Sequence, residues 1–228
     1  MLADEKDLIA ALFKWPIAVH SLAFIATFGR VLRFHRQYLK IAGTFLYALE
    51  EQHHLGLDPT AAGVPAKRKF YGAHLRTDVD AIAAHFASSA EQSAASIKAA
   101  ESHDLNFIYL ASGSLADITQ FTLDSATRGL TVVTKDLLLS APEFADVLPE
   151  VKSLAWDQQA LVDYLVLLRS SYFSGTWASS FAWDIAFRRH VVVLGSGEGV
   201  HSYAAMWKLG HPGGRRGRRG EMTSYLRE

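Results

Sequence analysis

The chain has 228 residues, half of them hydrophobic, which is enough to bury the core of one large domain. Lysine plus arginine and aspartate plus glutamate each number 23, so the bulk charge does not indicate nucleic-acid or anionic-membrane binding. The lack of cysteine excludes disulfides, thiolate metal sites and cysteine nucleophiles. No segment has the roughly 18 continuous apolar residues of a membrane span, and the charged residues 4–7 are not typical of a signal peptide.

The first part of the chain predicts helices rather than strands. A short helix is expected at 5–14, before Trp15-Pro16, and helical spacing of apolar residues predicts an amphipathic helix at 35–53. Residues 55–69 are rich in glycine and proline and predict a loop. We therefore expect a helical N-terminal segment and linker over residues 1–67.

Beyond this linker, short apolar runs alternate with helical patterns. Strands are predicted at 70–75, 106–111, 130–134, 172–174 and 191–194, and helices at 80–101, 115–128, 161–169 and 180–189. Such alternation is typical of βαβ units, and uniformly apolar strands indicate a parallel sheet covered on both faces. We predict an α/β fold with a Rossmann-like parallel sheet and flanking helices over residues 68–205.

The end of the chain differs in composition. Residues 206–228 include the run GHPGGRRGRRG at 210–220, which cannot bury a core and predicts a disordered basic tail. A basic arm could contact RNA or acidic lipid, or be a solvated tail.

In a parallel α/β sheet, ligands bind beyond the carboxyl ends of the strands, which points to the loops at 74–80, 112–114 and 175–180. His74 and Arg76 lie on the same side of a predicted strand, and a guanidinium there could hold a phosphate through two parallel N–H bonds. Alternatively, Arg76 pairs with Asp78 or Asp80 and His74 is an interior histidine with its hydrogen bonds satisfied.

Three further residues have two interpretations each. Ser179 and Ser180 open a predicted helix and either cap it or, with its first N–H groups, bind an anion. Asp163 falls in an apolar helical segment, where it could accept hydrogen bonds from a guanine edge or a ribose, or lie on the solvated face of its helix.

Other ligand motifs are poorly supported. The glycines of GSGEG at 195–199 lack the dinucleotide spacing, and no Walker sequence is present. His53-His54 and the other histidines have no carboxylate at a recognised metal spacing, so we expect no metal site.

Several motifs together resemble the protein O-fucosyltransferase family and its fungal members. They are HLRTDVD at 74–80, the strand IYLAS at 108–112, VVTKDLL at 132–138, Asp163, YFSG at 172–175 and Ser179-Ser180-Phe181. The similarity covers residues 68–194, with a weaker likeness at 15–34. It implies a GDP-fucose-dependent transferase of GT-B architecture, with this chain matching the carboxyl-terminal, nucleotide-sugar-binding half.

The resemblance implies roles for individual residues. It assigns the β-phosphate contact and the catalytic role to Arg76, a nucleotide-sugar contact to His74, and guanosine binding to Asp163. Asp80 would support the site, and the diphosphate would lie against Ser179, Ser180 and Phe181.

It also implies metal-independent, inverting transfer of fucose to a protein or glycan hydroxyl, without a cofactor, in the Golgi or endoplasmic reticulum lumen. Nothing in residues 1–69 resembles the glycine- and asparagine-containing loop of the family's amino-terminal Rossmann domain. We therefore expect a truncated member, with a non-catalytic GDP-sugar-binding or interaction module as the alternative.

Overall fold

A computed structural model of the chain describes residues 33–60, 69–176, 179–195 and 204–207. The predicted helix at 5–14, the GSGEG run after its first residue and all but the start of the predicted basic tail lie outside these ranges. Among the described residues, no helix is both long enough and apolar enough to cross a membrane.

The described residues form the predicted parallel sheet. Its five strands are β1 (Tyr71–His74), β2 (Phe107–Ala111), β3 (Thr131–Val133), β4 (Tyr172–Thr176) and β5 (Ala204–Trp207). They lie in the order β3-β2-β1-β4-β5, and each neighbouring pair is parallel. The Rossmann-like α/β prediction is thus confirmed, and the strand order reverses between β1 and β4.

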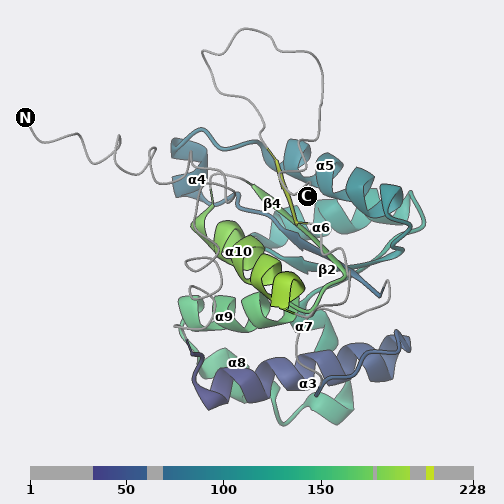
Figure 1. Cartoon of the computed structure of the whole chain (residues 1–228), viewed down its shortest axis with the longest axis vertical. Coiled ribbons are helices and arrows are strands. Elements are labelled where there is room, and N and C mark those ends of the chain that lie inside the picture. Colours follow the sequence, from purple (N-terminus) through teal and green to yellow (C-terminus); the bar gives the residue numbers. More distant parts are fainter. Residues whose placement is uncertain (1–32, 61–68, 177–178, 196–203, 208–228) are drawn as a thin grey trace, which may run out of the picture.

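Helices connect these strands and cover both faces of the sheet (Figure 1). Their bounds are α3 (Arg36–His53), α4 (Val79–Ala83), α5 (Ser89–Ser102), α6 (Leu115–Ala126), α7 (Lys135–Leu138), α8 (Leu148–Ser153), α9 (Trp156–Leu167) and α10 (Ser180–Gly195), with a 3₁₀ turn at Pro142–Phe144.

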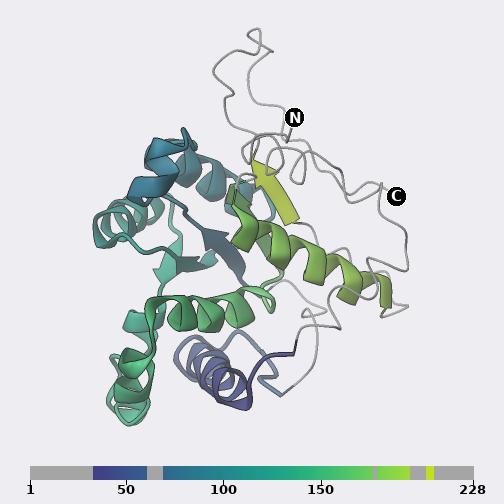
Figure 2. The same cartoon turned by 90° about the vertical axis from the view of Figure 1, so that its left-hand side faces the viewer.

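Alternating side chains of the strands build two cores. Ile108 and Leu110 of β2 pack with α5 and α6, whereas Tyr109 between them packs on the opposite face with α3, α9 and α10. Figure 2 shows α3 and α9 together on one side of the sheet. The predicted helix at 35–53 is confirmed as α3, and it shares this core with the sheet.

The alanine-rich stretch at 80–101 is not one helix as predicted. It forms α4 and α5, separated by residues 84–88, where His85 has φ 56°. Ser88 caps α5 by accepting from the Glu91 N–H, while the Glu91 carboxylate accepts from the Ser88 N–H. This capping box, visible as Ser-x-x-Glu, starts a new helix despite the helix propensity of the preceding alanines.

The predicted strand at 191–194 is wrong. Val191 to Leu194 belong to α10, and the chain returns to the sheet at β5. A short apolar run does not distinguish a strand from a buried helix, and the parallel β4–β5 pair requires a crossover connection, which is usually a helix. Helix α9 also starts at Trp156 rather than at 161, with the Gln158 side chain accepting from the Ala155 N–H.

Helix α10 carries Arg189, a fully buried arginine. Its guanidinium donates to the carbonyls of Leu167, Leu168, Ser170 and Ser171 at 2.6–3.2 Å, where α9 ends and β4 begins. Burial lowers the pKa of Arg189 to about 9. Because the last carbonyls of a helix have no intrahelical partner, this side chain caps α9 from a neighbouring helix.

Replacing Arg189 by methionine should lower the free energy of unfolding by about 3 kcal/mol, because several buried carbonyls lose their donor. Urea unfolding followed by circular dichroism measures the change. Arg128→Met is the control, since Arg128 is 61 % exposed and its surface pair with Glu101 contributes about 0–1 kcal/mol. Equal losses in the two variants would contradict the capping role.

Gly175 and Gly43 differ in the space around them, so substitution by alanine should have opposite effects on stability at the two positions. A Cβ at Gly175 of β4 would lie 2.6 Å from the Ala182 Cβ of α10, whereas one at Gly43 of α3 would meet nothing within 4 Å. We expect Gly175→Ala to destabilise the protein by about 1–3 kcal/mol and Gly43→Ala to stabilise it by about 0.5–1 kcal/mol. Thermal unfolding of both variants checks these opposite signs; destabilisation by Gly43→Ala would contradict the prediction.

Candidate functional site

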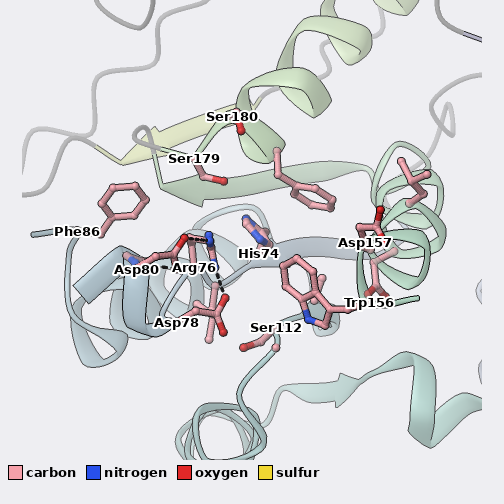
Figure 3. Close-up of a pocket in the computed structure, with 18 of the residues that line it drawn as sticks. His74, Arg76, Asp78, Asp80, Phe86, Ser112, Trp156, Asp157, Ser179 and Ser180 are labelled. Atoms are coloured by element: carbon pink, nitrogen blue, oxygen red, sulfur yellow. Dashed lines mark hydrogen bonds and ion pairs between the residues drawn. The ribbon is translucent and has the colours of Figure 1, made fainter. Parts of the chain in front are cut away.

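A pocket of about 490 Å³ opens at the carboxyl edge of the sheet, where β1 and β4 end. All seven residues singled out from the sequence line it: His74, Arg76, Asp80, Asp163, Ser179, Ser180 and Phe181. They come from three separate parts of the chain: the end of β1 and the residues after it, α9, and the residues after β4. The close-up in Figure 3 shows His74 in the middle of the pocket, with Arg76 and Asp80 to one side and the two serines above.

The position of Arg76 is fixed by both its backbone and its guanidinium. The buried Gln92 side chain of α5 accepts from the Arg76 N–H and donates to the Arg76 carbonyl, each at 2.9 Å. The guanidinium donates to Asp78 and Asp80, as the dashed lines of Figure 3 show. The intramolecular pairing considered for Arg76 is therefore present, and it involves both carboxylates while the residue lines the pocket.

His74 lines the pocket as a neutral imidazole rather than as a cation. Its ring packs against Phe181 with 4.5 Å between ring centroids, and no described group bonds its buried Nδ1. Burial, reinforced by the positive charge of Arg76, lowers the pKa of His74 to about 3. The idea of an interior histidine with satisfied hydrogen bonds is thus wrong for Nδ1, within the described part of the chain.

Ser179 caps α10, which is one of the two roles, capping and anion binding, that the sequence left open. Its hydroxyl accepts from the Ala182 N–H at 3.4 Å, and its carbonyl accepts from the Trp183 N–H at 3.0 Å. The cap places the amino end of a long helix at the pocket, beside Ser180 and Phe181. Such an end carries partial positive charge, so capping and anion binding are compatible here.

Asp163 is buried, only 5 % exposed, so the solvated-face interpretation is wrong. Its Oδ1 accepts from the Tyr109 hydroxyl at 2.7 Å and its Oδ2 from the Lys135 Nζ at 2.7 Å. Burial raises the pKa of Asp163, and the Lys135 ammonium opposes that rise. An ion pair between α9 and the first residue of α7 therefore forms part of the pocket wall.

The sequence analysis missed Lys135, Trp156 and Asp157, which also line the pocket. Lys135 directly follows the predicted strand at 130–134, and this position at a strand's carboxyl end was the available signal. Trp156 and Asp157 had no such signal, because the predicted start of their helix was five residues too late. Ser112 and Gly113 line the pocket from the loop after β2, as that loop's position predicted.

The pocket carries two cations, Arg76 and Lys135, and four carboxylates, at positions 78, 80, 157 and 163. Three of these carboxylates are paired with a cation. Among the residues that the structure describes, no group of three or more histidine, aspartate or glutamate side chains is arranged to hold a metal ion.

These features define a Rossmann-like α/β protein with a pocket of ligand size at the topological switch point of its sheet. A scan against models of known protein families found no match, and a search of curated proteins found none.

The low pKa of His74 predicts that the stability of the folded protein depends on pH. Between pH 6.5 and about 3 the unfolded chain binds a proton on His74 that the folded chain does not, so this residue's contribution to stability falls as pH falls through that range. The contribution of His74 to the free energy of unfolding should change by up to about 1.4 kcal/mol per pH unit in this range. Urea unfolding at several pH values should show a shallower slope for His74→Gln than for wild type, with His85→Asn as the exposed control; an unchanged slope would contradict the assignment.

Proposed function

We propose that this chain binds GDP-fucose in the pocket and supplies the donor site of a protein O-fucosyltransferase-like enzyme. One observation carries the proposal: the seven residues that the family resemblance names, widely separated in sequence, converge on a single pocket at the switch point of the sheet. The ends of β1 and β4 meet in any sheet with this strand order, and Asp163 of α9 is the named residue that the sheet alone does not bring to the same pocket.

In the bound state, Arg76 exchanges its carboxylate partners for the β-phosphate. Asp78 and Asp80 hold the guanidinium at the pocket before the ligand enters, and their side chains are 35 % and 68 % exposed, so both can return to water. The diphosphate then lies between Arg76 and the amino end of α10 at Ser180.

Transfer passes through an oxocarbenium-like transition state in which the bond between fucose and GDP breaks, and it uses no metal ion. Negative charge builds on the departing diphosphate, and Arg76 and the α10 N–H groups stabilise it as fixed, preoriented donors. Removing one such donor typically costs on the order of 10²- to 10³-fold in rate. The acceptor is a protein or glycan hydroxyl that attacks from the face opposite GDP, forms the new C–O bond as the bond to the β-phosphate breaks, and gives up its proton to the departing diphosphate or to water.

A second candidate is donor binding without transfer. It is favoured by the state of two groups in the pocket wall: Asp163 is paired with Lys135, and His74, with a pKa of about 3, is too weak a base for an acceptor hydroxyl near neutral pH. Fucose transfer or GDP-fucose hydrolysis by the purified chain would exclude this candidate.

Isothermal titration of GDP into the purified chain tests donor binding. Arg76→Ala should weaken GDP binding by roughly 100-fold or more, since a charge-assisted bidentate contact is lost. The matched control, Arg128→Ala, removes an exposed arginine outside the pocket and should bind GDP like wild type. Equal GDP affinity in wild type and Arg76→Ala, or no GDP binding by wild type, would refute the proposal.

A further inference from the structure

Gln92 of α5 is a buried glutamine, 1 % exposed, whose side-chain amide is fully hydrogen-bonded. Its Oε1 accepts from the Arg76 N–H at 2.9 Å. Its Nε2 donates to the Arg76 carbonyl at 2.9 Å and to the Ala87 carbonyl at 2.7 Å. Because both N–H groups of the amide are used and its oxygen faces a donor, the three partners also fix the orientation of the amide.

The Arg76 backbone depends on this side chain because it lies beyond the end of β1. The strand ends at His74, and the Leu75 N–H still donates to the Ala111 carbonyl of β2 at 3.0 Å. At Arg76 the Gln92 amide supplies one acceptor and one donor, as a residue of a neighbouring strand would. The Arg76 backbone is thus held much as a residue of the sheet is held.

The same amide closes the segment that leads from β1 to α5. Its Nε2 donates to the carbonyls of Arg76 and Ala87, and Ala87 directly precedes the Ser88 cap of α5. Residues 77–86 between these two carbonyls include the pocket residues Asp78, Asp80 and Phe86. Gln92 therefore fixes both ends of one wall of the pocket.

We propose that Gln92 is a positioning residue for the phosphate contact of Arg76. This assignment rests on the proposed function and extends it to a side chain that does not touch the ligand, since Gln92 is not among the described residues that line the pocket. Before a ligand enters, Asp78 and Asp80 hold the Arg76 guanidinium. Once a phosphate has replaced these carboxylates, the backbone bonds to Gln92 keep the arginine directed into the pocket.

The physical reason is the geometry of the arginine contact. A guanidinium binds a phosphate through two parallel N–H bonds, and these are lost when its position shifts. Arginine is a long side chain with many rotamers, so an anchored backbone lowers the entropy that is lost when the contact forms. Without the Gln92 amide, the Arg76 N–H and carbonyl would lose buried partners, and the residue would have to move to find others.

The test compares GDP and GMP by isothermal titration, because the ratio of their affinities measures the contact to the second phosphate. Gln92→Met removes all three hydrogen bonds, keeps a similar side-chain size and leaves every pocket residue unchanged. We expect the GDP-to-GMP affinity ratio to fall roughly tenfold or more, since a misplaced guanidinium loses its bidentate contact. An unfolded fraction lowers both apparent affinities by the same factor, so reduced stability does not change the ratio.

The matched control is Ser96→Ala, one turn further along α5. It removes the buried hydrogen bond between Ser96 and Ser174, 3.1 Å long, and should leave the ratio unchanged. If Gln92→Met does not fold, Gln92→Glu replaces it: this change keeps the acceptor for the Arg76 N–H, removes both donors, and should also lower the ratio.

A double-mutant cycle separates positioning from a general loss of structure. Because Gln92 acts through the Arg76 side chain, Gln92→Met should change GDP affinity by less than about twofold when Arg76 is already alanine. A merely structural Gln92 would weaken GDP binding equally with and without the Arg76 side chain.

Three results would overturn the assignment alone: a wild-type GDP-to-GMP ratio in both Gln92 variants, an equal fall of the ratio in Ser96→Ala, or additive losses in the cycle. Equal wild-type affinities for GDP and GMP would remove the phosphate contact of Arg76 and this inference together. If wild type binds neither nucleotide, the proposed function fails and this inference fails with it.

Discussion

The buried guanidinium of Arg189 joins the elements on which the pocket depends. It donates to the carbonyls that end α9 and to those of Ser170 and Ser171, which lead into β4. The same turn bonds the segment before β1, because the Ser171 N–H donates to the Phe70 carbonyl and the Lys69 N–H to the Ser171 hydroxyl. One cation thus fixes α9, β1, β4 and its own helix, α10, relative to one another.

These elements also carry pocket residues. β1 leads to His74 and Arg76, β4 leads to the Ser179 cap of α10, and α9 carries Asp163. A buried charge is costly unless it is hydrogen-bonded, so the carbonyls that accept from the two terminal nitrogens of Arg189 specify its position.

Charged side chains of the pocket are also held by partners of the same chain. Both of its cations are held by carboxylates: Arg76 by the half-buried Asp78 and the exposed Asp80, and Lys135 by the buried Asp163. The more exposed carboxylates of Arg76 can be replaced by a ligand at smaller cost, whereas the buried pair keeps its geometry. The first suits an anionic group, and the second suits a polar, uncharged group.

Local sequence patterns determined the strands of β1 to β4, the parallel sheet and the loops where a ligand would bind, because apolar runs and strand ends are properties of neighbouring residues. Tertiary structure decided what those patterns leave open. The apolar run at 191–194 lies in α10, which carries the crossover from β4 to β5. The capping box that divides the alanine-rich stretch into two helices was, by contrast, readable locally as Ser-x-x-Glu at 88–91. The partners of Asp163, 54 and 28 residues away, and those of Arg189 were set by packing alone, because a buried charge is neutralised by whichever groups the fold brings beside it.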